Sequence, residues 1–421
     1  MEHRILIVED NQTLAKVIAN KLESKLNLKV DVAYTMQEAK LFLKAYKYFI
    51  SILDLSLPDA PNGEIVQYAL KKEQHVIIVS ANLDKETRQT LLKKNIIDYI
   101  NKQSIHDVNY IDYLVSSIDR LMKNQKHEVL VVDDSLVMRK QIQSMLENLF
   151  FKVITVAHGE EALGMLKAKP NISLVLTDYN MPVMNGLELT IEIRKEFSKD
   201  ELCILALSAN EEDEVSSLFL KNGANDFIKK PFSKEEFSCR INNSIEALEN
   251  IQMVMNYANR DFLTGLYNRR YFYNAMEEYI ESARETSEKF AIAMIDIDHF
   301  KKVNDTYGHE VGDKAIVSLA DILRSSTNPN DVVSRFGGEE FCVVLKNINN
   351  KSAKDILERI RKTVESFHLS LPNKESLNFT ISIGATIHDY DDSLDDTIGQ
   401  ADMMLYKAKN DGRNQLICDE H

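Results

Sequence analysis

The chain has 421 residues, a length that predicts two to four domains rather than one. With 51 Lys and Arg against 65 Asp and Glu, its formal net charge of −14 argues against nucleic acid and anionic lipid as partners, since both attract clustered positive charge. Four scattered cysteines without CxxC spacing, and no apolar run of about 20 residues, predict a reducing, cytoplasmic setting and no membrane partner.

The first half contains an internal repeat. RILIVED at 4–10 matches EVLVVDD at 128–134, and each is an apolar run that ends in two acids. ILDLSLPD and VLTDYNMP then place the single aspartates Asp54 and Asp178, while VIIVSAN and CILALSAN place Ser80 and Ser208. We therefore expect two copies of one domain.

Segments of helical periodicity, such as residues 11–26 and 135–150, separate the apolar runs. This alternation predicts βαβ units, with a parallel sheet covered by helices on both faces. The acids, serines and lysines follow the ends of apolar runs, and the carboxyl ends of parallel strands line one crevice. These residues should therefore converge although they are scattered in the sequence.

Three carboxylates at one sheet edge would repel each other unless a hard cation such as Mg²⁺ took their oxygens. An aspartate there could attack a phosphoryl group, with a lysine and a serine on the phosphate oxygens. Each copy resembles the receiver domains of two-component response regulators, which implies flavodoxin-like (βα)5 domains at 1–123 and 126–245. The resemblance implies Mg²⁺ sites at Glu9, Asp10 and Asp54 and at Asp133, Asp134 and Asp178.

The same resemblance implies that Asp54 and Asp178 are phosphoacceptors served by a histidine kinase or a phosphotransfer protein. The implied switch residues are Ser80, Lys102 and Tyr99 in the first copy, and Ser208, Lys230 and Phe227 in the second. A receiver can also keep its acids and act mainly as a docking surface, so phosphorylation of each copy is a separate hypothesis. The motif match favours the second copy.

A long helix is predicted to leave the second copy. Ser233 and Glu236 form a capping-box pattern, and apolar residues recur at three- and four-residue steps without Pro or Gly until Gly265. We expect residues 246–260 to be a connector helix. Its apolar stripe fits either intramolecular packing or a dimeric helix contact.

The last third, residues 261–421, has no counterpart in the repeat. AIAMIDID at 291–298 predicts a buried strand that ends in acids, and DVVSRFGGEEFCVVL at 331–345 predicts a tight hairpin at Gly337 and Gly338. If the two elements are neighbours, Asp296 and Glu339 form another carboxylate cluster. With Mg²⁺ and cations placed on a polyphosphate, such a cluster suits phosphoryl or nucleotidyl transfer.

This region resembles the GGDEF domain of diguanylate cyclases, in its GGEEF form, through DFLTGLYNRR, DIDHFKKVNDTYGHEVGD, SRFGGEEF, TISIGAT and AKNDGRN. The resemblance implies an α+β domain with a central, mostly antiparallel sheet that condenses two GTP into cyclic di-GMP as a homodimer. The implied metal ligands are Asp296, the Ile297 carbonyl and Glu339, and the implied catalytic residues are Glu339, Glu340 and Lys301. Substrate would be bound by Asn304, His309, Asp313, Lys409 and Arg413.

The product-inhibition site of that family has an RxxD pattern, where this chain has Asn328-Pro329-Asn330-Asp331. Asp331 and Arg359 match positions of the site, but asparagine cannot make the bidentate contact of arginine. We therefore predict weak or absent feedback inhibition. The alternative function is a phosphorylation-controlled adaptor whose GGDEF domain only binds GTP or cyclic di-GMP.

Overall fold

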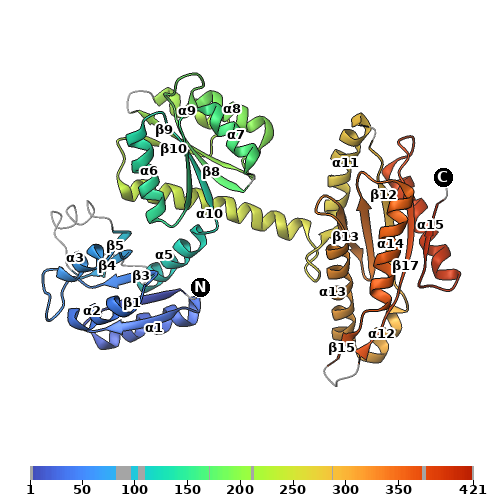
Figure 1. Cartoon of the computed structure of the whole chain (residues 1–421), viewed down its shortest axis with the longest axis horizontal. Coiled ribbons are helices and arrows are strands. Elements are labelled where there is room, and N and C mark those ends of the chain that lie inside the picture. The colour runs from blue at the N-terminus through green and yellow to red at the C-terminus, as the bar shows by residue number, and fades with distance from the viewer. Residues whose placement is uncertain are drawn as a thin grey trace. The chain divides into compact units, whose positions relative to one another are not determined.

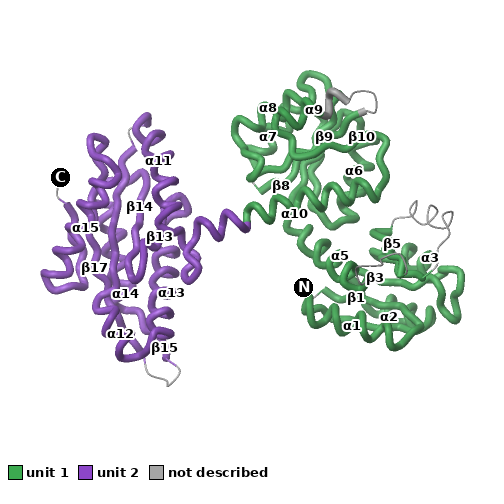
Figure 2. The backbone as a smooth tube through the Cα atoms, turned by 180° about the vertical axis from the view of Figure 1, so that it is seen from behind, with its two compact units in different colours: residues 1–252 green, residues 253–421 purple. Residues whose placement is uncertain are grey.

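A computed structural model describes residues 3–81, 96–102, 110–169, 171–209, 213–286, 288–371 and 376–419 (Figure 1). The chain divides into two compact units, Met1–Gln252 and Met253–His421 (Figure 2). The first unit contains two five-stranded sheets, and the second contains a six-stranded sheet and a small two-stranded one.

The first sheet has the strand order β2-β1-β3-β4-β5, and all of its pairs are parallel. Its strands are β1 (Arg4–Val8), β2 (Lys29–Ala33), β3 (Ile50–Leu53), β4 (Val76–Ser80) and β5 (Asp98–Asn101). Alternate strand residues face opposite sides. Ile5 and Ile7 pack with α1 (Gln12–Leu26) and α5 (Tyr110–Asn124), whereas Leu6 and Val8 pack with α2 (Met36–Ala45) and α3 (Glu64–Lys71).

The second sheet repeats this plan in the order β10-β9-β8-β6-β7, again with parallel pairs. Its strands are β6 (Glu128–Val132), β7 (Lys152–Val156), β8 (Ile172–Asp178), β9 (Cys203–Ala209) and β10 (Asp226–Lys230). Its helices are α6 (Leu136–Asn148), α7 (Gly159–Ala168), α8 (Gly186–Glu196), α9 (Asp213–Lys221) and α10 (Lys234–Asn259). The predicted pair of flavodoxin-like folds and the long helix after them are confirmed.

The two sheets of the first unit are joined by side-chain contacts. Glu249 on α10 accepts hydrogen bonds from Arg120 on α5, at 2.6 and 2.8 Å, and its carboxylate lies 2.7 Å from the His127 ring. The Arg120 contact, with His127, lowers the pKa of Glu249 to about 2 although burial opposes it. The ring of Phe150, in the turn after α6, lies 4.4 Å from those of Phe49 and His75. One hydrophobic cluster therefore includes residues of both sheets.

The second unit has a sheet in the order β11-β13-β14-β12-β17-β18. Its strands are β11 (Tyr267–Asn268), β12 (Ala291–Ile297), β13 (Val332–Gly337), β14 (Glu340–Leu345), β17 (Ile381–Ile387) and β18 (Leu416–Cys418). The three central pairs are antiparallel and the two outer pairs are parallel. This confirms the predicted α+β fold with a mostly antiparallel sheet. β15 (Leu369–Ser370) and β16 (Ser376–Leu377) pair separately.

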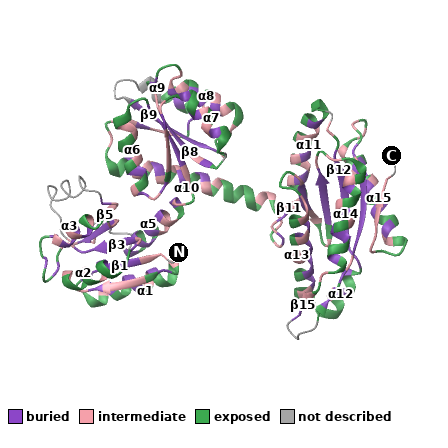
Figure 3. Ribbon diagram, in the orientation of Figure 1, coloured by how far each residue is buried: buried purple, intermediate pink, exposed green. Residues whose placement is uncertain are grey.

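Helices cover both faces of the six-stranded sheet, whose central strands are buried (Figure 3). α13 (His309–Ser326) and α14 (Asn350–Glu365) pack on one face, and α11 (Arg269–Thr286) and α15 (Leu394–Asn410) on the other. α15 lies so close to β17 that a Cβ atom on Gly384 would come within 2.0 Å of the Leu405 nitrogen. Within the described residues, no helix combines the length and apolar character that a bilayer crossing requires.

Candidate functional site

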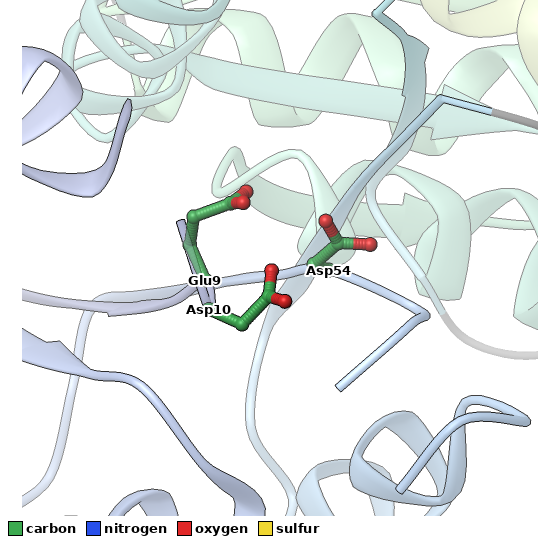
Figure 4. Close-up of side chains that lie close together, drawn as sticks. All are labelled: Glu9, Asp10 and Asp54. Carbon is green, nitrogen blue, oxygen red and sulfur yellow. The ribbon is translucent and has the colours of Figure 1, made fainter. Parts of the chain in front are cut away.

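The first acid cluster lies at the carboxyl edge of the first sheet. β1 ends before Glu9 and Asp10, and its neighbour β3 ends before Asp54. Each of these residues offers a carboxylate oxygen within 4.8 Å of the others (Figure 4). Lys102, which follows β5, donates to Glu9 at 2.8 Å and to Asp54 at 2.6 Å. Hard oxygen donors at this spacing fit Mg²⁺.

Burial of these acids is costly without a cation. Glu9 and Asp54 are 3% and 7% exposed. Burial raises the pKa of Glu9, and the Lys102 ammonium partly opposes that shift. One lysine therefore compensates two buried carboxylates, and a divalent cation bound by the three acids would complete the neutralisation.

The second sheet repeats the cluster with Asp133, Asp134 and Asp178, whose carboxylate oxygens also lie within 4.8 Å of one another. Lys230 donates to Asp133 at 3.1 Å and to Asp178 at 2.7 Å. Burial raises the pKa of Asp178, with Asp133 adding to the shift and Lys230 opposing it. Both predicted sets of acids and lysines are thus brought together.

The predicted switch residues lie on the two strands beside each cluster. Ser80 ends β4 and Ser208 lies in β9, and both serines are buried. Tyr99 on β5 and Phe227 on β10 are half-buried.

The loops after the lone aspartates differ between the copies. Asp59 accepts hydrogen bonds from the backbone at the start of α2, whereas the matching Val183 is 84% exposed.

A third group of charges lies in the second unit, where β12 runs between β14 and β17. In the β12–β14 register Asp296 is opposite Glu340, and a tight turn at Gly337 and Gly338 joins β13 to β14. Asp296 is 5% exposed, and Lys409 of α15 lies 2.8 Å from its carboxylate. Burial raises the pKa of Asp296 to about 6, against the Lys409 contact and with the help of Glu339 and Glu340.

The carboxylates of Asp296, Glu339 and Glu340 are hard oxygen donors of the kind that Mg²⁺ prefers, and the two glutamates lie close enough to Asp296 to raise its pKa. The structure adds a partner that the sequence did not suggest: Lys409 contacts Asp296 itself. Lys301, His309 and Arg413 are exposed and therefore accessible to a ligand.

Asn304 and Asp313 lie on consecutive helices, α12 (Phe300–Tyr307) and α13. The Asn304 Oδ1 atom is buried and has no hydrogen-bond partner within the described residues, and a Cβ on Gly312 would come within 1.9 Å of it. Glycine at 312 thus makes room for the amide. An open pocket of about 280 Å³ borders Asp313, and its other lining residues are Leu263, Lys314, Val317, Ser318 and Leu369.

Two further charged residues hold the hairpin and were missed in the sequence. Arg335 on β13 donates twice to the Gly338 carbonyl, at 3.0 and 2.7 Å, and to Asp261 at 2.9 Å. Gly338 has φ +49°, a left-handed value that glycine adopts without strain. Both charged residues stand in the motifs DFLTG and SRFGG, so a charge beside an apolar run was the available signal.

The two positions matched to a product-inhibition site have backbone partners. The Asp331 carboxylate accepts from the Asn328 amide at 2.7 Å and from the Lys346 amide at 3.0 Å. Arg359 is exposed and donates to the Ser326 carbonyl at 3.5 Å. Asp331 thus has a structural role in the turn before β13.

Comparisons with known proteins match one family to the part of the chain with the first two acid clusters, and another family to the part with Asp296. The response regulator receiver domain model matches residues 5–109 and 129–242, and the model for the diguanylate cyclase GGDEF domain matches residues 258–415. Response regulator PleD of Caulobacter vibrioides is 30% identical over 298 residues, which are 69% of this chain and 65% of that protein. Diguanylate cyclase A of Treponema denticola is 39% identical over 179 residues, covering 42% of this chain and 48% of its own length.

The chain therefore spans less than two thirds of the length of these relatives. A crystal structure described as a two-component system response regulator/GGDEF domain protein is 36% identical, with a TM-score of 0.53. It covers 59% of this chain and 100% of its own.

Proposed function

The chain belongs to the response regulators that carry two receiver domains and a C-terminal GGDEF domain, and we propose that it is a phosphorylation-regulated diguanylate cyclase. The proposed domain limits are 1–123 and 126–245 for the receivers, 246–260 for the connector and 261–421 for the cyclase. The relatives named as diguanylate cyclase or response regulator support this assignment. The proposal also includes activity as a homodimer, because each cyclase domain would hold one GTP.

The proposed phosphoacceptor is Asp54 in the first receiver and Asp178 in the second. A carboxylate oxygen of Asp54 or Asp178 would attack a phosphoryl group on a phosphohistidine, and the phosphorus–nitrogen bond of the donor would break. Lys102 or Lys230 would then exchange its carboxylate partner for a phosphate oxygen. The acids of each cluster would hold Mg²⁺, which supplies positive charge for the phosphoryl oxygens.

In the cyclase domain the 3′-hydroxyl oxygen of one GTP would attack the α-phosphorus of the other, and pyrophosphate would leave. The attacking hydroxyl would give its proton to the carboxylate of Glu339 or Glu340. A second, identical step closes the ring, so two GTP yield one cyclic di-GMP and two pyrophosphates. Asp296, the Ile297 carbonyl and Glu339 would hold Mg²⁺, which supplies charge neutralisation for the phosphates.

The remaining substrate contacts follow from side-chain chemistry. Lys301 would stabilise negative charge that develops on the reacting phosphate, and Lys409 and Arg413 would bind the β- and γ-phosphates. Asn304, His309 and Asp313 would contact the base and ribose. A carboxylate at Asp313 accepts from the N1–H and the amino group of guanine, a donor edge that adenine lacks.

One observation carries the cyclase proposal. Asp296, at the end of a central strand, faces the acids of a glycine hairpin and contacts Lys409 from a separate helix. Carboxylates and a cation gathered at one strand end are what a metal and a triphosphate require.

The test is product analysis after incubation of the full chain with GTP and Mg²⁺. We expect cyclic di-GMP and pyrophosphate in a 1:2 ratio, no conversion of ATP, and no product from Glu339→Gln. GTP binding without product under every condition, including with acetyl phosphate, would refute the cyclase and favour the adaptor.

A further inference from the structure

The loop after α15 has an unusual backbone conformation. Gly412, Arg413 and Asn414 have φ values of +115°, +62° and +44°. Left-handed values at residues other than glycine cost energy and persist only where the surroundings enforce them. The side chain of Arg413 is exposed and takes part in no ion pair with the described residues. This strained loop therefore presents an accessible guanidinium group.

The backbone amide of Arg413 donates to the Ala408 carbonyl at 3.0 Å, and Asn414 ties the loop to the rest of the domain. Its backbone amide donates to Asp298 Oδ2 at 3.0 Å. Its side-chain Oδ1 accepts from Arg361 Nη1 at 2.7 Å, and its Nδ2 donates to Glu365 Oε1 at 2.7 Å. One hydrogen bond to the turn after β12 and two to α14 thus fix the residue directly after Arg413.

Arg361 is the buried α14 partner of Asn414, and we call these two residues the clamp. It is only 9% exposed, and its guanidinium donates to Glu358 at 3.0 and 2.7 Å and to Glu365 at 3.0 Å. A buried arginine is costly unless its donors are satisfied. Here they are satisfied by two carboxylates of its own helix and by the Asn414 amide, so α14 provides a fixed support for the loop.

Asp298 links the loop to the proposed metal site. It is 5% exposed and accepts from Ser382 Oγ at 2.6 Å and Thr380 Oγ1 at 2.7 Å, in addition to the Asn414 amide. Asp298 follows the end of β12, two residues after Asp296. The strand end that carries the proposed metal ligand therefore also anchors the loop that carries Arg413.

We infer that Asn414 and Arg361 are positioning residues, which hold Arg413 in place to receive the terminal phosphates of the nucleotide. The inference rests on the proposed cyclase function and adds a role for residues that touch no substrate. A guanidinium group that is already placed loses less conformational entropy when it binds phosphate than one on a mobile loop. Loss of the clamp should therefore weaken binding of a triphosphate but leave binding of the base and ribose unchanged.

The test compares two nucleotides on the full chain in Mg²⁺, by calorimetric titration. The first, 3′-deoxy-GTP, has the triphosphate but lacks the attacking hydroxyl, and the second, GMP, lacks the β- and γ-phosphates. Asn414→Gly removes both side-chain bonds while glycine tolerates the positive φ, and Arg361→Lys removes the bridge to Asn414. Lys362→Ala is the matched control, because Lys362 is a 67% exposed cation on α14 that also contacts Glu358.

We expect about tenfold weaker binding of 3′-deoxy-GTP in both clamp variants, unchanged binding of GMP, and no effect of Lys362→Ala. Arg413→Ala should weaken 3′-deoxy-GTP binding as well, and the double variant with Asn414→Gly should bind no more weakly than Arg413→Ala. An Asn414→Gly protein that binds 3′-deoxy-GTP as tightly as the wild type, or that loses GMP to the same extent, would overturn the inference. A wild-type chain that binds neither nucleotide would instead refute the proposed function.

Discussion

Replacement of Asp296 by Asn should stabilise the metal-free protein while it abolishes the proposed activity. The pKa of this buried carboxyl is raised to about 6 from an ordinary value of 3.8. Between about pH 4 and 6 the carboxyl is therefore protonated in the folded protein but already ionised in the unfolded chain. Stability of the metal-free protein therefore falls as the pH rises through this window, and at neutral pH the buried charge is a net cost.

The size of the effect follows from that shift. A difference of about two pKa units corresponds to about 3 kcal/mol at pH 7.5. The shift already includes the contact with Lys409, but asparagine brings an amide that must also be buried. We expect a net gain of about 1 kcal/mol in the free energy of unfolding, which raises the melting temperature of a unit of this size by about 2–4 °C.

The assay is thermal unfolding of the wild type and Asp296→Asn in EDTA at pH 7.5 and again at pH 4. The variant should melt higher at pH 7.5, and this gain should be lost at pH 4, where the wild-type carboxyl is protonated. Asp355→Asn, at an exposed carboxyl on α14, is the control and should show no shift at either pH. A variant that melts below the wild type in EDTA at pH 7.5 would refute the reasoning.

Three further predictions concern the receivers and product control. Asp178→Asn should abolish activation by beryllofluoride, measured as the rate of cyclic di-GMP formation, with a smaller loss for Asp54→Asn; full activation of the double variant would exclude phosphorylation control. Glu249→Gln should destabilise the first unit by about 1 kcal/mol at pH 7, after allowance for solvent screening. Contact with Arg120 lowers the pKa of Glu249 to about 2, so this difference in unfolding free energy should shrink as the pH falls from about 4.5 toward 2. Chemical denaturation measures the difference, and a value that does not change with pH would contradict the prediction. Synthesis of cyclic di-GMP by the wild-type chain should be little inhibited by added cyclic di-GMP, whereas Asn328→Arg should create inhibition. Strong inhibition of the wild type would refute the prediction.

The receiver folds could be predicted because their information is local. Alternation of apolar runs with helical periodicity indicates a parallel sheet, and the carboxyl-end rule then brings scattered acids together. Asp54 and Lys102, far apart in sequence, accordingly lie in contact. The GGEEF hairpin was predictable for the same reason, since two glycines between strand-like runs mark a tight turn.

The contacts between motifs could not be predicted, because they depend on tertiary packing. Nothing in the sequence near Asn414 indicates that its amide bonds to Asp298 or that its side chain lies between Arg361 and Glu365. The ion pair of Lys409 with a carboxylate was likewise hidden, because the sequence suggested only a phosphate partner. Such contacts join residues from separate elements, and only the folded chain shows them.

The most direct measurement of the central claim is the initial rate of cyclic di-GMP formation from GTP and Mg²⁺ as a function of protein concentration, with and without beryllofluoride. A phosphorylation-regulated, dimer-dependent cyclase predicts a specific rate that rises with protein concentration, in parallel with the dimer fraction from sedimentation. Beryllofluoride should shift both curves to lower concentration. No cyclic di-GMP at any concentration, in a protein that still binds GTP, would contradict the account.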